Sequence, residues 1–182
     1  MQNHIKEKKG FTLLETAISL GFLTIGFLVL ISLSTNYVKT LTLARERVIA
    51  TFLSQEGLEA VLAKRNENFK QGPNDVWWLD GLAGTTASKS TADSSVICID
   101  VTLNMVSACS DDNSKLYRDA DGFYLHTVSS DTPVFSRKIT LHPVDTPSFD
   151  TAKVVAVISQ VSFIGKQVEL TTLMTQWNPL SQ

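Results

Sequence analysis

The stretch KKGFTLLETAISLGFLTIGFLVLISLS, residues 8–34, decides how this chain of 182 residues is organised. Between Phe11 and Ser34 the only ionisable side chain is Glu15. As a helix these 24 residues extend roughly 36 Å, and the hydrocarbon core of a bilayer is about 30 Å thick. The stretch therefore predicts a membrane-spanning helix that carries one carboxylate near its start.

A secretory signal peptide is the alternative interpretation of this stretch. The apolar core of such a peptide is about 7 to 15 residues long and ends at a small-x-small cleavage site. Here the apolar run is longer and continues without a break into a helical pattern. Three lysines precede the run, and the positive-inside rule keeps them in the cytosol, which sends the chain after Ser34 outward.

The carboxylate of Glu15 needs an explanation, because a charged side chain inside a bilayer costs of order 3 kcal/mol. One explanation is local, since Thr12-Leu13-Leu14-Glu15 fits the S/T-x-x-E capping box, in which Glu15 reaches back to the amide of Thr12. A capping role accounts for a carboxylate near the positive end of a helix. It does not account for the Lys-Lys-Gly sequence directly before Phe11.

The segment KKGFTLLE with the long apolar run behind it resembles the class III signal of type IV pilins and type II secretion pseudopilins. The resemblance implies that a prepilin peptidase cuts between Gly10 and Phe11 and methylates the new amino terminus on Phe11. It also implies that Glu15 faces the α-amine of a neighbouring subunit's Phe11. Pairing of these two charges would offset the desolvation that each suffers alone in the apolar layer.

The chain beyond the apolar run keeps a helical period as far as about Asn68, with no proline before Pro73. Its apolar positions recur mostly at three-, four- and seven-residue steps, which is typical of an amphipathic helix. They are Val38, Leu41, Val48, Phe52, Leu58 and Leu62. We expect this stripe to cover a sheet. Many major pilins carry a proline in the membrane helix, so its absence favours a minor pilin or a pseudopilin.

After the helix the hydrophobic period changes from 3.6 to 2, which predicts β-strands. They are expected over residues 96–103, 122–128, 133–142, 153–163 and 166–177. Ile164-Gly165-Lys166 should join the last two as an antiparallel hairpin. Two alternating apolar sets should form the buried face: Phe135, Ile139 and Leu141, and Val155, Val157, Val161 and Phe163.

The predicted fold is α+β, with a long amino-terminal helix packed on a carboxy-terminal antiparallel sheet, which is also the pilin fold. We expect four segments. They are a cytosolic leader over 1–10, the transmembrane half of the helix over 11–34, its amphipathic outer half over 35–69 and a β-rich globular domain over 70–182.

Cys98 and Cys109 are the only cysteines, with ten residues between them. In an oxidising compartment a disulfide closing such a loop is worth roughly 3 kcal/mol, whereas in a reducing one they would be two buried thiols. Export of this half of the chain favours the disulfide. A pair of cysteines without histidine partners is a poor zinc site.

The segment RDADGFY, residues 118–124, has two interpretations. Asp119 and Asp121 precede Gly122, as in a calcium loop, but the further acidic or amide ligands and the closing glutamate of an EF-hand are missing. Asp-Gly between strand-like runs favours a hairpin turn.

Other candidate sites are weak. Trp77 and Trp78 are expected to pack in the core or against the helix, with surface adhesion as the alternative. His126 and His142 lack partners at metal-ligand spacing. The chain has no serine elbow, phosphate-binding loop or dinucleotide fingerprint, so we expect neither an enzyme nor a cofactor nor a metal. A net charge of −2 does not favour nucleic acid as a partner.

Two functional hypotheses follow. In the first, the chain is a minor pilin or pseudopilin of a type IV pilus or type II secretion-type filament. Its partners are then prepilin peptidase, other pilin or pseudopilin subunits, the inner-membrane assembly machinery and the membrane, and it moves from the inner membrane to a surface or periplasmic filament. In the second, the chain is a monomeric membrane-anchored adhesion or binding protein, and Glu15 is only a helix cap.

Overall fold

The computed structural model describes residues 12–70, 78–82, 94–99, 105–107, 109–126, 132–149 and 151–176. The chain divides into two compact units, Met1–Arg45 and Glu46–Gln182. One helix, α1 (Leu13–Lys70), provides the described part of the first unit and continues into the second. Its 58 residues contain no proline, which is why no helical hydrogen bond is lost along it.

The first unit consists of an apolar helix whose side chains have no cover within the unit. Large hydrophobic residues from Leu13 to Leu41 are at least half exposed. This part of α1 is long and apolar enough, by length and composition, to cross a membrane. The helix begins after Thr12, whose hydroxyl oxygen accepts a hydrogen bond of 3.3 Å from the backbone N–H of Glu15.

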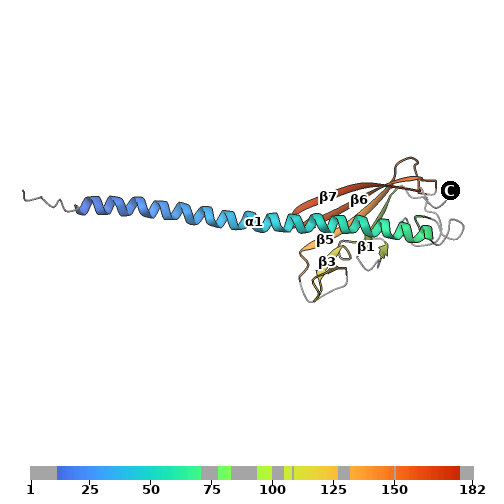
Figure 1. Cartoon of the computed structure of the whole chain (residues 1–182), viewed down its shortest axis with the longest axis horizontal. Coiled ribbons are helices and arrows are strands. Elements are labelled where there is room, and N and C mark those ends of the chain that lie inside the picture. The colour runs from blue at the N-terminus through green and yellow to red at the C-terminus, as the bar shows by residue number, and fades with distance from the viewer. Residues whose placement is uncertain are drawn as a thin grey trace, which may run out of the picture. The chain divides into compact units, whose positions relative to one another are not determined.

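The second unit places the outer half of α1 along one antiparallel sheet (Figure 1). The described residues form seven strands. They are β1 (Ser95–Ile99), β2 (Met105–Ser107), β3 (Lys115–Arg118), β4 (Tyr124–Leu125), β5 (Phe135–Pro143), β6 (Val154–Phe163) and β7 (Lys166–Thr175). These elements confirm the predicted α+β arrangement of a long helix on an antiparallel sheet.

Strand β5 is the centre of the sheet. Along one edge it pairs with β6 over its full length, and β6 pairs in turn with β7. The other edge is shared, because β3 pairs with Phe135 and Ser136 while β1 pairs with Ile139, Thr140 and Leu141. The short strands β2 and β4 extend β1 and β3, respectively.

The predicted strands are confirmed best where the pairing is local. The hairpin of β6 and β7 turns at Ile164 and Gly165, which both have left-handed backbones with φ of 44° and 68°. Of the strand expected over 122–128, the described residues 122–126 form only the two-residue β4, and 127–128 lie outside the described residues. The strand expected over 96–103 is β1, with 100–104 outside the described residues. Strands β2 and β3 were not predicted, because each is too short to show an alternating pattern.

The core lies between α1 and the inner face of the sheet. The alternating residues predicted to be buried on β5 and β6 all are, with exposed fractions of 3% or less. Trp78 follows the end of α1 and is also buried, at 4% exposure, as the packing interpretation predicted, whereas Trp77 lies outside the described residues. The side-chain amide of Asn68 donates to the carbonyl oxygens of Trp78 and Asp80, which fixes this turn against the helix.

The predicted covering stripe of the helix is wrong in four of its six positions. Those four side chains are exposed by 50% to 66%; they are Val38, Leu41, Val48 and Phe52. Only Leu58 and Leu62 pack against the core, and both are partly buried. The buried face is built mainly from small side chains instead: Ala50, Leu53, Ser54, Gly57, Ala60, Val61 and Asn68. Small residues allow the helix to approach the sheet closely, so the larger apolar residues do not mark the contact.

Gly57 is a point of close approach between α1 and the sheet. A Cβ atom at this position would lie 2.9 Å from Ser159 Oγ, 3.0 Å from Arg137 Cδ and 3.1 Å from Ile139 Cδ1. Glycine lowers the stability of a helix interior by up to about 1 kcal/mol relative to alanine. The close packing of β5 and β6 on the helix accounts for a glycine at this place.

Replacing Gly57 with leucine should lower the free energy of unfolding by about 1–3 kcal/mol, because the new side chain overfills the contact with the sheet. The measurement is urea unfolding of the full-length protein in detergent micelles. Ala63→Leu is the matched control, since Ala63 is exposed on the same helix and its change should stay within about 0.5 kcal/mol. Equal stability of the Gly57 and Ala63 variants would contradict the close packing.

Asp145 closes the end of the hairpin formed by β5 and β6. Its carboxylate accepts hydrogen bonds from the backbone N–H groups of Lys153, at 2.9 Å and 3.2 Å, and of Val154, at 3.2 Å. The hydrogen bond from the N–H of Lys153 is the largest cause that lowers the pKa of Asp145; desolvation opposes it, and the N–H of Val154 lowers the pKa further. The ionised carboxylate is therefore favoured in the folded protein.

Because the pKa of Asp145 is lower in the folded state, its stabilising effect is present above the unfolded pKa of roughly 3.9 and is lost as the pH falls through the folded value. Asp145→Asn should therefore reduce stability at neutral pH and reduce it progressively less in acid. Unfolding of both proteins measured across this pH range provides the test. A stability difference that does not change with pH would contradict the assignment.

Candidate functional site

Glu15 lies in the first turn of α1, on the exposed apolar half of the helix. Its backbone N–H donates to Thr12 Oγ1, and its carbonyl accepts a hydrogen bond of 2.8 Å from the hydroxyl of Ser19. Its carboxylate accepts no hydrogen bond from the residues that the structure describes. A capping box has two hydrogen bonds, and one of them is present here, from the backbone N–H of Glu15 to the hydroxyl of Thr12. The other would use the carboxylate of Glu15, which is therefore left free.

The surroundings of Glu15 are apolar and uncovered within the described chain. Leu14 and Ile18 are exposed by 71% and 51%, respectively, and Leu13 by 87%. The predicted cleavage position between Gly10 and Phe11 lies outside the described residues, as does the leader over 1–10. The structure therefore places Glu15 on the surface of the helix, and the roles of Gly10 and Phe11 stay predictions.

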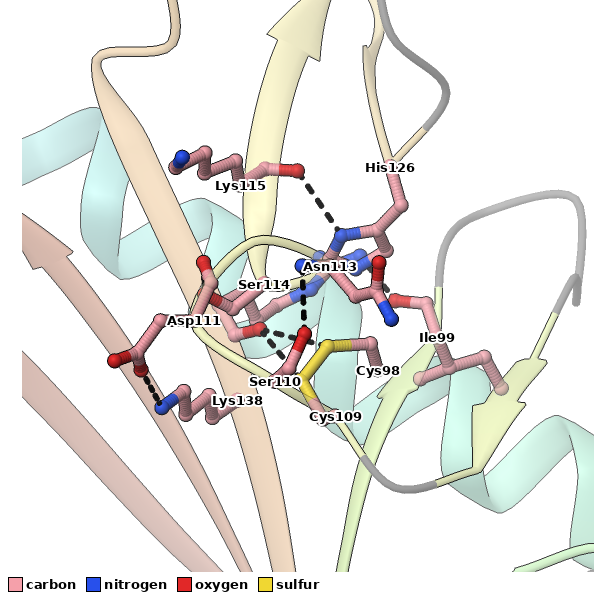
Figure 2. The surroundings of a disulfide bond; sticks show 11 residues. Cys98, Ile99, Cys109, Ser110, Asp111, Asn113, Ser114, Lys115, His126 and Lys138 are labelled. Carbon is pink, nitrogen blue, oxygen red and sulfur yellow. Dashed lines mark hydrogen bonds and ion pairs between the residues drawn. A yellow bond between two sulfur atoms is a disulfide. The ribbon is translucent and has the colours of Figure 1, made fainter.

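Cys98 and Cys109 are joined in a disulfide, with their Cα atoms 5.2 Å apart. Cys98 lies near the end of β1 and is fully buried, whereas Cys109 follows β2 and is half-buried. Figure 2 shows the bridge between the β1 strand and the segment that leads through Ser110 to Ser114. The bridge therefore ties β1 to the segment that follows β2.

Arg137 is the residue of greatest structural consequence that the sequence analysis missed. Its side chain is fully buried, and its Nη1 donates to the carbonyl of Leu53, at 2.9 Å, and to Glu56 Oε1, at 2.8 Å. Its Nη2 donates to the carbonyl of Ile99. The signal was present, because an arginine alternates with Phe135 and Ile139 on a face predicted to be buried.

The turn between β3 and β4 confirms the hairpin interpretation of RDADGFY. The backbone N–H of Asp119 donates to the carbonyl of Phe123, and the carboxylate of Asp119 accepts from the N–H of Phe123 at 2.8 Å. Gly122 has a φ of 92°, in the left-handed region that glycine adopts readily. Among the described residues no group of three histidine, cysteine or acidic side chains could hold a metal ion.

The two histidines considered as metal ligands have separate places in the fold. His126 follows β4, with its Nδ1 atom 3.2 Å from the carbonyl of Lys115 (Figure 2), and His142 is half-buried on β5. Among the described residues, neither histidine belongs to a group of three or more histidine, cysteine or acidic side chains that could hold a metal ion.

A polar hollow of about 350 Å³ lies over the outer face of the sheet. Its lining contains two lysines, Lys115 and Lys138, which are paired with Asp112 and Asp111, respectively. The hydrogen bond and the charge of Lys138 lower the pKa of Asp111, and those of Asp112 raise the pKa of Lys115. Because each lysine is already compensated, this hollow offers no free charge to an anionic ligand.

Comparison of the chain with models of protein families, with curated proteins and with solved structures finds no match. A proposal for the function therefore depends on the sequence of the predicted leader and on the exposed apolar half of α1.

Proposed function

We propose that this chain is a structural subunit, a minor pilin or pseudopilin, of a type IV pilus or type II secretion-type filament. The observation that carries the proposal is the carboxylate of Glu15, which lies without a hydrogen-bond partner among the described residues on an exposed apolar helix. In the sequence this helix follows a basic segment that ends in Gly10. Prepilin peptidase removes the leader, and the subunit then assembles through its amino-terminal helix.

The surface around Glu15 supports assembly over a simple anchor. A lipid bilayer would cover the apolar side chains of the first unit but would offer no counter-charge to a carboxylate. Cleavage before Phe11 creates an α-amine, and a neighbouring subunit supplies both an apolar helix and this positive charge. Such a pair offsets the desolvation of each group, which neither lipid nor the local capping bond does.

The outer half of α1 presents a second apolar surface that favours a protein neighbour. Val48 and Phe52 lie one helical turn apart and are exposed by 54% and 66%, respectively. Both follow the apolar run that ends at Ser34, in a part of the helix that also carries Arg45 and Arg47. A neighbouring subunit's helix would cover these two side chains in a filament.

In this proposal the precursor is a single-pass inner-membrane protein with its outer unit exported. The mature subunit then enters a cell-surface or periplasmic filament with the inner-membrane assembly machinery. The continuous helix over Leu13–Lys70, without a proline in its membrane part, fits a minor pilin or pseudopilin better than a major pilin.

Gly10→Val should accumulate uncut precursor, because the peptidase must admit an extended backbone before Phe11 and the new side chain obstructs it. The masses of the membrane-bound protein, measured by mass spectrometry, distinguish the two forms. Gly26→Val is the matched control, since a Cβ atom at Gly26 meets nothing within 4 Å, and it should be processed normally. Normal maturation of Gly10→Val would reject the cleavage site.

Glu15→Gln should insert and be processed normally yet fail to enter filaments. Glutamine keeps the shape of the side chain but removes its charge, which leaves the neighbour's amine unpaired at a cost of about 3 kcal/mol or more per contact. A capping role predicts instead a loss near or below about 1 kcal/mol, because glutamine also serves in a capping box.

The measurement is incorporation of tagged subunits into sheared filaments at equal membrane levels. Glu59→Gln, an exposed position on the outer half of the same helix, serves as the control and should assemble like wild type. Wild-type incorporation of Glu15→Gln would defeat the pairing mechanism and favour the membrane-anchored monomer.

A further inference from the structure

The buried guanidinium of Arg137 connects the helix to the disulfide-bonded hairpin. Its two acceptors on α1 are the carbonyl of Leu53 and the carboxylate of Glu56, and its acceptor on β1 is the carbonyl of Ile99. Ile99 directly follows Cys98 in the chain. A single side chain thus binds both the docked helix and the residue next to the bridge.

The position of the Ile99 carbonyl depends on the hairpin more than on the centre of the sheet. The pairing of β1 with β5 reaches only Ile97, opposite Ile139, so Cys98 and Ile99 extend beyond it. There β1 is paired with β2 alone, and β2 has three residues. The disulfide to Cys109 is the covalent restraint on this end of β1.

The disulfide also contacts the main chain of Arg137. The carbonyl oxygen of Arg137 lies 3.6 Å from the sulfur of Cys98 and 3.9 Å from that of Cys109. The backbone N–H of Arg137 donates to the carbonyl of Ser114, at 2.8 Å, which belongs to the segment after Cys109. The disulfide and the segment after it therefore contact the backbone of Arg137, in addition to the contact of its side chain with the carbonyl of Ile99.

A buried cation is sensitive to the loss of any one acceptor. The Arg137 side chain is fully buried, and Glu56, which is about one-third exposed, is its one charged partner within the described chain. When a partner of a buried charge moves away, the charge is left incompletely solvated and the packing around it is destabilised. On α1 this packing involves the buried face around Gly57, called here the Gly57 face. A Cβ atom on Gly57 would lie 3.0 Å from the Cδ atom of Arg137.

We propose that the disulfide and Arg137 form a latch that holds the Gly57 face of α1 on the sheet. A dithiol reductant supplies two electrons and two protons, so the S–S bond breaks, Cys98 and Cys109 become thiols and the reductant becomes a disulfide. The end of β1 is then free to move, and the carbonyl of Ile99 leaves Arg137. The hydrogen bonds from Arg137 to Leu53 and Glu56, which hold the helix, are lost as a result. This conformational coupling does not depend on the proposed filament role.

The test is hydroxyl-radical footprinting of full-length protein in detergent, comparing wild type with the double variant Cys98→Ala, Cys109→Ala. Leu53 is 4% exposed in the docked helix, whereas its neighbour Phe52 is 66% exposed. Opening of the latch should raise the oxidation rate of Leu53 on the order of tenfold, as local undocking exposes it, and leave that of Phe52 unchanged. Met174, fully buried elsewhere in the core, should keep its protection.

A second variant separates the latch from a general loss of stability. Glu56→Gln weakens the hold of Arg137 on the helix, so it should expose Leu53 in the bridged protein but add little once the cysteines are replaced. Glu67→Gln, which removes the exposed Lys64–Glu67 pair on the same helix, is the matched control and should have no effect.

Four results would overturn the latch. The first is two free thiols in the isolated protein, and the second is unchanged protection of Leu53 in the double variant. The third is equal exposure of Leu53 and Met174, which would mean that the disulfide stabilises the whole unit and not the helix contact in particular. Independent effects of Glu56→Gln and of cysteine replacement would likewise reject the coupling.

Discussion

The contact between Gly57 and the sheet is the constraint on which the outer unit depends. With the helix backbone this close, Ser159, Arg137 and Ile139 fill the space that any larger side chain would need. The hydroxyl of Ser54, one turn earlier, donates to the carbonyl of Ser159, so the contact is polar as well as close. The buried face of α1 can therefore consist of small residues, and the large apolar side chains are left for other surfaces.

The two halves of α1 differ in what covers their apolar side chains. Within the second unit, β5 and β6 supply an inner face of alternating apolar residues that matches the helix. In the first unit the described chain supplies nothing of the kind, and the large hydrophobic side chains from Leu13 to Leu41 are left exposed. A soluble monomer could not keep such a surface in water, which is the physical reason for seeking its cover in a bilayer or in other subunits.

Sequence reasoning succeeded where period and local pairing determine the structure. The alternation of Val161 and Phe163 with Gln160 and Ser162 located β6, and the Ile164-Gly165 turn joined it to β7. It failed where long-range contacts decide, since nothing local distinguishes Gly57 as a contact from Phe52 as an exposed residue. For the candidate site, the composition around Glu15 predicted an apolar helix long enough to span a membrane, and the structure has such a helix by length and composition. A buried arginine at position 137, by contrast, becomes understandable only when Leu53, Glu56 and Ile99 converge on it.

The order in which the partners of α1 appear along the chain has a consequence for biogenesis. Ser54 meets its acceptor 105 residues later, and Leu53 meets Arg137 after 84 residues. Synthesis proceeds from the amino terminus, and contacts of such separation form slowly because the intervening loop must be closed first. The β5–β6–β7 meander, by contrast, is built from neighbouring segments. The helix therefore leaves the ribosome long before the strands that cover it. Its Gly57 face stays uncovered until nearly the whole chain has been synthesised.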